Sequence, residues 1–297
     1  MPELENKMQR DIKNILLSGK ARLESALHLD SSTSRIEVQS LLQHVLNVQR
    51  SYLLAHPERA LSEIEQDRYE ILLQRRLSGE PIAHLLGSRE FFGLDFKVTS
   101  DTLIPRPETE LLVEQALQRI GPSGHDGRSS LRVLDLGTGT GAIALSIAHT
   151  RPDVEVIAVD ASDAALQVAR ENAERLGVRN VSFVLSDWFT ALEGQCFDLI
   201  AANPPYIIDD DEHLSQGDVR FEPLSALASG TDGLDDIRRI IAAAPRHLSS
   251  KGWLLLEHGY DQAEPVRALL EQNGFDKVFS EKDLAGIERI SGGQLPV

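Results

Sequence analysis

The 297-residue chain has 41% hydrophobic and 26% charged residues, an ordinary globular composition that excludes the disordered class. No apolar run approaches the roughly twenty residues of a membrane-spanning helix, and the single cysteine, Cys196, excludes an internal disulfide and a cysteine-based metal cluster. The first residues are polar and lack the apolar core of a signal peptide. These features predict a cytoplasmic protein without a membrane span.

The net charge of −16 is unevenly distributed along the chain. Residues 1–76 contain 11 Lys and Arg against 11 Asp and Glu, so residues 77–297 contain 19 basic against 35 acidic side chains. A surface this acidic repels a phosphate backbone. We therefore expect no direct nucleic-acid binding, although local basic patches remain compatible with these counts.

Residues 1–85 are predicted to form an N-terminal α-helical bundle. Apolar residues follow the i, i+3, i+4, i+7 spacing of one helix face at Val38, Leu41, Leu42 and Val45. Ser62 and Glu65 form a capping-box pattern before a second apolar stripe, and Gly79 ends that helix. Mutual packing of these stripes is the expected arrangement, and a docking surface for a partner is the alternative.

The next segment, residues 86–105, changes character. Glycines beside alternating apolar residues predict a short β-hairpin that links two domains. Residues 106–297 are predicted to form the second domain, beginning with a helix that has Pro107 in its first turn. A glycine- and serine-rich stretch at 121–130 predicts a flexible connector.

From Leu131 onward, short apolar runs alternate with amphipathic helical segments. This alternation predicts βαβ units and an α/β fold, with a mostly parallel, doubly wound sheet covered on both faces. The last expected elements are a helix at about 261–273 and two strands within 276–291.

A glycine-rich loop follows the first of these strands, which is expected to end at Asp135. Gly137, Gly139 and Gly141 allow a sharp turn and a close approach of the backbone to a ligand. Asp160 is expected to end the next strand, where a carboxylate can accept hydrogen bonds from ribose hydroxyls. The combination predicts a nucleotide pocket at the carboxyl ends of the strands.

The glycines alone leave the cofactor open, because with Ala142 they also satisfy the dinucleotide fingerprint of dehydrogenases. The tighter form Asp-Leu-Gly-x-Gly-x-Gly resembles the first motif of S-adenosylmethionine-dependent methyltransferases. In such enzymes an acidic residue after the third strand meets the adenine amino group, a place that Asp187 occupies here. Trp188 can stack on the adenine, with ordinary core packing as the alternative.

The sequence "NPPY" at 203–206 follows the fourth strand. A planar, conjugated nitrogen is a poor nucleophile, so its N–H groups must be held while its lone pair points at the methyl group. Asn203 offers a side-chain carbonyl and Pro204 a main-chain carbonyl as acceptors. Pro204 and Pro205 stiffen the corner, and Tyr206 can lie against the flat substrate group. These residues predict positional and electrostatic help to methyl transfer.

The motif "NPPY" after a glycine-loop domain marks methyltransferases that act on adenine N6 or on glutamine N5. Further stretches resemble the peptide chain release factor N5-glutamine methyltransferase family, at 76–98, 102–117, 186–189, 217–230 and 254–259. The resemblance implies an N-terminal helical domain, used by analogy in substrate recognition, joined by a hairpin to a Rossmann-like methyltransferase domain. The implied substrate is the glutamine of the Gly-Gly-Gln motif in release factors, whose methylation modulates translation termination.

The resemblance also implies a role for each motif residue. S-adenosylmethionine, which leaves as S-adenosylhomocysteine, would be bound without a metal by Gly137, Thr138, Gly139, Thr140, Gly141, Asp160, Asp187, Trp188 and Asn203. Catalysis would rest on Asn203, Pro204 and Tyr206, with Pro205 also in the substrate site.

Three alternatives remain open. An adenine-N6 methyltransferase shares "NPPY" but needs a basic surface, a dehydrogenase leaves "NPPY" unexplained, and a non-catalytic module would not need both motifs. The acidic run at 209–213 is expected to be a solvated loop rather than a metal site. Arg106, Glu108, Arg220 and Glu222, in two proline-containing connections, are expected to brace the substrate loop, with simple pairing among themselves on the surface as the alternative.

Overall fold

The computed structural model describes residues 10–121 and 130–297. The chain divides into two compact units, Met1–Gly87 and Ser88–Val297. Most of the predicted connector at 121–130 lies outside the described residues, so its conformation stays a prediction.

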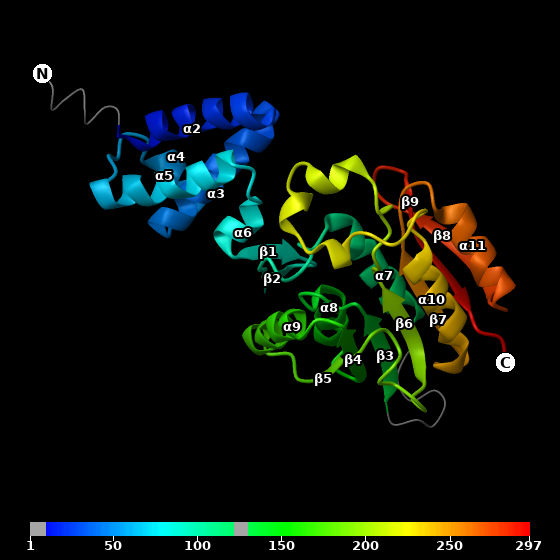
Figure 1. Cartoon of the computed structure of the whole chain (residues 1–297). Helices are drawn as coiled ribbons and strands as arrows, with labels where there is room; N and C mark the ends of the chain where they lie inside the picture. Colours follow the sequence, from blue (N-terminus) through cyan, green and yellow to red (C-terminus); the bar gives the residue numbers. More distant parts are fainter. Residues whose placement is uncertain (1–9, 122–129) are drawn as a thin grey trace, which may run out of the picture. The chain divides into compact units, whose positions relative to one another are not determined.

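The first unit is helical, as the apolar stripes predict (Figure 1). Its described helices are α2 (Ile12–Leu27), α3 (Ser31–Leu46), α4 (Arg50–Ala55), α5 (Glu63–Leu77) and α6 (Ile82–Leu86). Three residues of the predicted stripe, Val38, Leu41 and Leu42, are almost fully buried in the core of this unit, where they pack with residues such as Leu23 and Leu73. The stripe therefore serves the mutual packing of the helices.

The predicted capping box at the start of α5 is present. The Ser62 hydroxyl accepts from Glu65 N at 3.3 Å, and the Glu65 carboxylate accepts from Ser62 N at 2.8 Å. We expect Ser62→Ala to lower the free energy of unfolding by about 1 kcal/mol, because one amide of the first turn loses its partner. Urea unfolding followed by circular dichroism measures this loss. Ser51→Ala, at an exposed position of α4, is the matched control, and an equal loss in both variants would contradict a capping role.

The second unit begins with the predicted hairpin, formed by β1 (Ser88–Phe91) and β2 (Leu94–Lys97). Phe91 and Phe96 are buried in a core that this hairpin shares with the rest of the unit. Asn172, on the helix α9 (Asp163–Leu176), accepts from Lys97 N at 2.7 Å and donates to Lys97 O at 3.0 Å. These contacts attach the hairpin to the second unit.

A seven-stranded sheet forms the centre of the second unit, in the order β5-β4-β3-β6-β7-β9-β8. Five strands run parallel, namely β3 (Leu131–Leu136), β4 (Val154–Asp160), β5 (Val181–Leu185), β6 (Phe197–Ala202) and β7 (Leu248–Glu257). The last two strands, β8 (Asp276–Lys282) and β9 (Glu288–Gln294), join antiparallel, in the region where two strands are predicted.

Helices cover both faces of this sheet (Figure 1). Alternate strand residues point to opposite faces, so Val133 packs with α7 (Glu110–Arg119) and α8 (Ala142–Thr150), which bury residues in the same cluster. Leu134 belongs to the opposite cluster with α10 (Asp235–Ala243) and α11 (Ala263–Gln272). The predicted doubly wound α/β fold is confirmed, although α10 is not predicted from the sequence.

The strand order reverses direction at one point. From β3 the chain proceeds through β4 to β5 on one side and then returns to place β6 on the other side of β3. Leu136 and Ala202, which end β3 and β6, are direct neighbours in the sheet. In open α/β sheets a ligand binds outside the carboxyl ends of the strands at such a switch point. The glycine loop and "NPPY" both start there.

Candidate active site

A cavity of about 390 Å³ lies at this switch point, entirely within the second unit. Its volume falls within the range of small-molecule pockets. The predicted site residues in its lining are Gly137, Thr138, Gly139, Thr140, Asp160, Asp187, Trp188, Asn203 and Pro205. Three predicted residues, Gly141, Pro204 and Tyr206, are not among the described residues that line it. The structure thus brings together segments that are up to 68 residues apart in the predicted set, between Gly137 and Pro205.

The glycine loop is held by its own backbone. Gly137 N and Thr138 N both donate to Val159 O at 2.8 Å, and Gly141 N donates to Thr138 O at 2.8 Å. Gly141 has a φ of 85°, and a Cβ there would lie 2.8 Å from Leu145 Cδ1. The positive φ is therefore the main reason for glycine at this position, and the packing of the loop near Leu145 of α8 adds to it.

A buried carboxylate, Asp135, binds both the glycine loop and α8. It accepts from Thr138 Oγ1 at 2.6 Å and from Ala144 N at 3.1 Å through one oxygen, Oδ2. Complete burial raises the pKa of Asp135 to about 7, against the opposing effect of these two hydrogen bonds. Asp135 thereby connects the loop to the first turn of α8.

Asp160 joins the loop to the end of β4. Its Oδ2 accepts from Gly139 N at 2.9 Å, and its Oδ1 accepts from Ser162 N at 2.9 Å. Burial raises the pKa of Asp160, while these backbone hydrogen bonds oppose the rise. Because each carboxylate oxygen has a second lone pair, the fixed carboxylate can still accept from a ligand in the cavity.

Asp187 and Trp188 are both tied to α10. Asp187 forms an ion pair with Arg239, with oxygen–nitrogen distances of 2.9 and 3.1 Å. Trp188 Nε1 donates to Asp236 Oδ1 at 3.0 Å, which fixes the indole beside the glycine loop. Asp236 and Arg239 also line the cavity, and neither is among the residues predicted from the sequence. The apolar spacing of Ile237, Ile240 and Ile241 was the available signal for α10.

Asn203 follows β6, and its Nδ2 donates to Thr109 Oγ1 at 3.2 Å. Thr109 ends the 3₁₀ helix η1 (Pro107–Thr109) and lines the same cavity. The Tyr206 hydroxyl donates to Glu257 Oε1 at 3.4 Å, and burial raises the pKa of Tyr206. Thr109 and Glu257 were also missed, although an acidic residue that closes the apolar strand "LLLE" is a signal for a buried charge.

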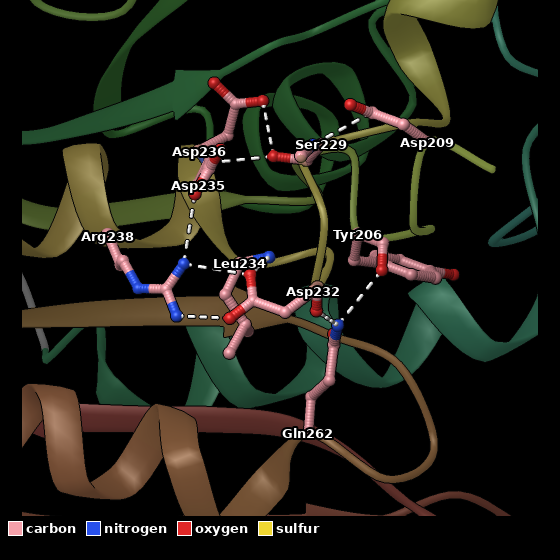
Figure 2. Close-up of polar contacts among 10 residues, drawn as sticks. Tyr206, Asp209, Ser229, Asp232, Leu234, Asp235, Asp236, Arg238 and Gln262 are labelled. Carbon is pink, nitrogen blue, oxygen red and sulfur yellow. Dashed lines mark hydrogen bonds and ion pairs between the residues drawn. The ribbon is translucent and has the colours of Figure 1, made fainter.

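The segment after "NPPY" folds back on itself around the corner, as Figure 2 shows. Gln262 Nε2 donates to Tyr206 O at 3.0 Å and to Asp232 O at 3.3 Å. A Cβ at Gly233 would lie 2.2 Å from Tyr206 O, so only glycine fits there. Ser229 Oγ donates to Asp236 Oδ2 at 2.8 Å. These contacts hold the "NPPY" backbone against α10 and α11.

The proline-containing connections are joined by a partly buried ion pair. Arg106, which lines the cavity, pairs with Glu222, whose side chain is fully buried. Glu222 Oε2 also accepts from Ile104 N at 3.0 Å. Arg106 and Glu222 therefore join these two segments, while a bracing role toward the substrate loop stays a prediction.

The acidic run at 209–213 is capped locally, since Asp211 accepts from His213 N at 2.8 Å. Within residues 10–121 and 130–297, no group of three or more His, Cys, Asp or Glu side chains is placed to hold a metal ion. Among the helices that the structure describes, none has the length and apolar character needed to cross a membrane.

Family models match both units. A methyltransferase-domain model matches residues 128–283, and a PrmC N-terminal domain model matches residues 14–87. Two solved structures share the fold of the second unit. The hMettl16 catalytic domain, solved in complex with a MAT2A 3'UTR hairpin, has a TM-score of 0.55 at 19% identity and covers 75% of this chain and 81% of that one. A Pyrococcus furiosus methyltransferase has a TM-score of 0.52 at 18% identity, and the match covers 75% of this chain and 98% of that one.

Curated relatives match nearly the whole chain. A release factor glutamine methyltransferase of Bordetella pertussis is 51% identical over 90% of this chain and 97% of its own length. A relative of the same name from Salmonella typhimurium is 49% identical over 89% of this chain and 94% of its own length. Another, from Burkholderia pseudomallei, is 51% identical over 93% of this chain and 96% of its own length. This chain therefore belongs to the release factor glutamine methyltransferase family.

Proposed function

We propose that this protein transfers a methyl group from S-adenosylmethionine to N5 of the glutamine in the Gly-Gly-Gln motif of peptide chain release factors, and so modulates translation termination. The observation that carries the proposal is the orientation of Asn203 at the cavity. Its Nδ2 is engaged by Thr109, so its Oδ1 is the side-chain atom left to accept from a substrate amide.

The residues present fit S-adenosylmethionine. The positive-φ glycines of the loop bring the backbone close to the cavity without a Cβ, as the methionine end of the cofactor requires. We assign this end to the loop from Gly137 to Gly141, with Thr138, Gly139 and Thr140 between them. The bound cofactor supplies a methyl group already activated by a sulfonium, so no metal is needed, and it leaves as S-adenosylhomocysteine.

The rest of the cofactor is assigned to the next two strand ends. Asp160 would accept hydrogen bonds from the ribose through its free lone pairs. Asp187 would meet the adenine amino group, and its ion pair with Arg239 leaves lone pairs for this contact. Trp188, held through Asp236, would cover the adenine face. Asn203 lies between the cofactor and the substrate.

In the proposed mechanism the "NPPY" corner orients the substrate nitrogen. Asn203 Oδ1 and Pro204 O accept its two N–H groups, which turns the lone pair toward the methyl group. When bound, the cofactor would supply the methyl group and retain the electron pair of its carbon–sulfur bond on sulfur, and the substrate nitrogen would lose one N–H proton to solvent. Pro205 keeps the corner stiff, and Tyr206, anchored on Glu257, lies against the amide.

We also propose a division of labour along the chain. Residues 1–85 form the helical domain, used in substrate recognition, 86–105 the hairpin link, and 106–297 the methyltransferase domain. The substrate partner is a release factor in the cytoplasm rather than nucleic acid, because residues 77–297 hold 35 acidic against 19 basic side chains.

The test is a methyl-transfer assay with labelled S-adenosylmethionine and purified release factor. We expect label on the glutamine of the Gly-Gly-Gln motif, located by peptide mass spectrometry. A release factor with that glutamine replaced by alanine is the control. Undiminished labelling of the control would refute the substrate assignment, and label in nucleic acid at moderate salt would favour the adenine-N6 alternative.

A further inference from the structure

The Asn203 carboxamide is one end of a largely buried polar chain. Its Nδ2 donates to Thr109 Oγ1 at 3.2 Å, and Thr109 is 4% exposed. The Thr109 hydroxyl lies close enough to the carboxylate of Glu257, which ends β7 and is 2% exposed, to lower the pKa of that carboxyl, although the two groups form no hydrogen bond of standard geometry. Tyr206 donates to the same carboxylate at 3.4 Å. Two residues outside the "NPPY" motif, Thr109 and Glu257, thus contact the side chains of Asn203 and Tyr206.

The two carboxylate oxygens of Glu257 differ. Oε1 accepts from Tyr206, whereas Oε2 is buried and makes no direct hydrogen bond with any described residue. A buried acceptor without a partner is costly, so such a group calls for an explanation. The charge of this carboxylate is therefore available to attract the proton of a neighbouring hydroxyl.

The polarity of these contacts follows from the groups themselves. An ionised carboxylate has no proton to donate and attracts one, so the single proton of the nearby Thr109 hydroxyl is expected to turn toward Glu257. Thr109 Oγ1 can then only accept from Asn203, which requires Nδ2 rather than Oδ1 on that side. A carboxamide turned by 180° would present donors to the N–H groups of the substrate, and the two sets of donors would repel each other.

We propose that Glu257 and Thr109 are positioning residues, which hold the Asn203 carboxamide with Oδ1 toward the substrate amide. This inference rests on the proposed function, because Asn203 Oδ1 needs a fixed orientation only if it accepts a hydrogen bond from the substrate amide. Neither residue touches the reacting atoms; both act through Asn203.

The proposal has a pH consequence. Burial raises the pKa of Glu257 to about 7, and Glu108 raises it further, while Thr109, Arg289 and Tyr206 lower it. Protonated Glu257 is itself a donor, so Thr109 can turn its proton toward Asn203 and release the carboxamide from its orientation. We therefore expect kcat to fall as the pH falls through about 7.

The first variant is Glu257→Gln, which keeps the volume but places an N–H donor beside Thr109. We expect kcat at pH 8 to fall by about tenfold or more, with the KM for S-adenosylmethionine changed by less than about twofold, and the acid limb of the kcat profile to disappear. Glu155→Gln is the control, because Glu155 lies near the amino end of β4, away from the cavity.

The second pair of variants separates positioning from packing. Thr109→Val removes the hydroxyl at nearly constant volume. Its kcat is expected to fall by as much as that of Glu257→Gln. Thr109→Ser keeps the hydroxyl, removes a methyl group and is expected to retain most of the kcat. Equal losses in the two Thr109 variants, with unchanged circular dichroism and thermal melting, would overturn the positioning role.

A readout independent of activity completes the test. In protein labelled with ¹⁵N-asparagine, the Nδ2 resonance of Asn203, assigned with Asn203→Asp, is expected to exchange slowly with solvent. Faster exchange in Glu257→Gln and Thr109→Val supports the inference, whereas unchanged exchange together with a wild-type pH profile of Glu257→Gln refutes it. If the proposed function itself is wrong, the result is different: the wild-type enzyme then transfers no methyl group to the release factor.

Discussion

Asn203→Ala is expected to lower kcat for methyl transfer by about 10²- to 10³-fold, the loss typical of removing one preorganised polar group from a reacting centre. The variant removes the side-chain acceptor at the substrate nitrogen and leaves the glycine loop and Asp160 in place. The Kd for S-adenosylmethionine is therefore expected to change much less than kcat. Single-turnover kinetics measures the chemical step, and calorimetric titration measures cofactor binding.

The matched control is Asn273→Ala. Asn273 follows α11 and its Nδ2 donates to Leu269 O at 2.8 Å, so this variant also removes a carboxamide whose Nδ2 is hydrogen-bonded. It lies outside the cavity lining and is expected to retain the wild-type kcat. A loss of cofactor affinity in Asn203→Ala as large as its loss of kcat would contradict the substrate-orienting role.

Asp160→Ala is expected to weaken binding of S-adenosylmethionine by roughly 10- to 100-fold. The change removes the acceptor for Gly139 N and Ser162 N as well as the proposed acceptor for the ribose, and hydrogen bonds to a charged group are among the stronger ones. At saturating cofactor the kcat is expected to recover, since the "NPPY" corner is unchanged. Calorimetry and initial rates at increasing cofactor concentration check both statements.

Asp160→Asn refines this prediction, because the amide keeps one acceptor and replaces the other by a donor. An intermediate affinity is expected. Burial raises the pKa of Asp160, so wild-type affinity is expected to fall with decreasing pH as the carboxylate becomes protonated, while Asp160→Asn shows no such dependence. Equal affinities of the wild type and Asp160→Ala would contradict the assignment of this carboxylate to the cofactor.

Some features of this protein follow from short stretches of sequence. The capping box at Ser62 and the glycine loop satisfy local requirements, a partner for a first-turn amide and a positive φ. The alternation of β-rich and amphipathic runs likewise reports which face of each element is buried. The α/β class, the strand ends that carry Asp160 and Asn203, and the family itself could therefore be predicted.

One local pattern was overlooked rather than absent. The helix α10 shows apolar spacing in its own sequence, yet no helix is predicted there. This helix matters for the site, because its Asp236 accepts a hydrogen bond from Trp188 and its Arg239 forms an ion pair with Asp187.

Other features were decided only by the tertiary structure. Thr109 is 94 residues from its partner Asn203, and Glu257 is 51 residues from Tyr206. Such pairs leave no periodic signal, because they form only when the strand order places β6 beside β7 and the helix α7, which follows η1, packs against both. The motif "NPPY" by itself predicts which acceptors would face a planar nitrogen, whereas the fold decided the hydrogen bond between Asn203 and Thr109. The reason is physical: the backbone conformation and burial of a residue depend on its neighbours in sequence, but the direction of a buried hydrogen bond depends on its neighbours in space.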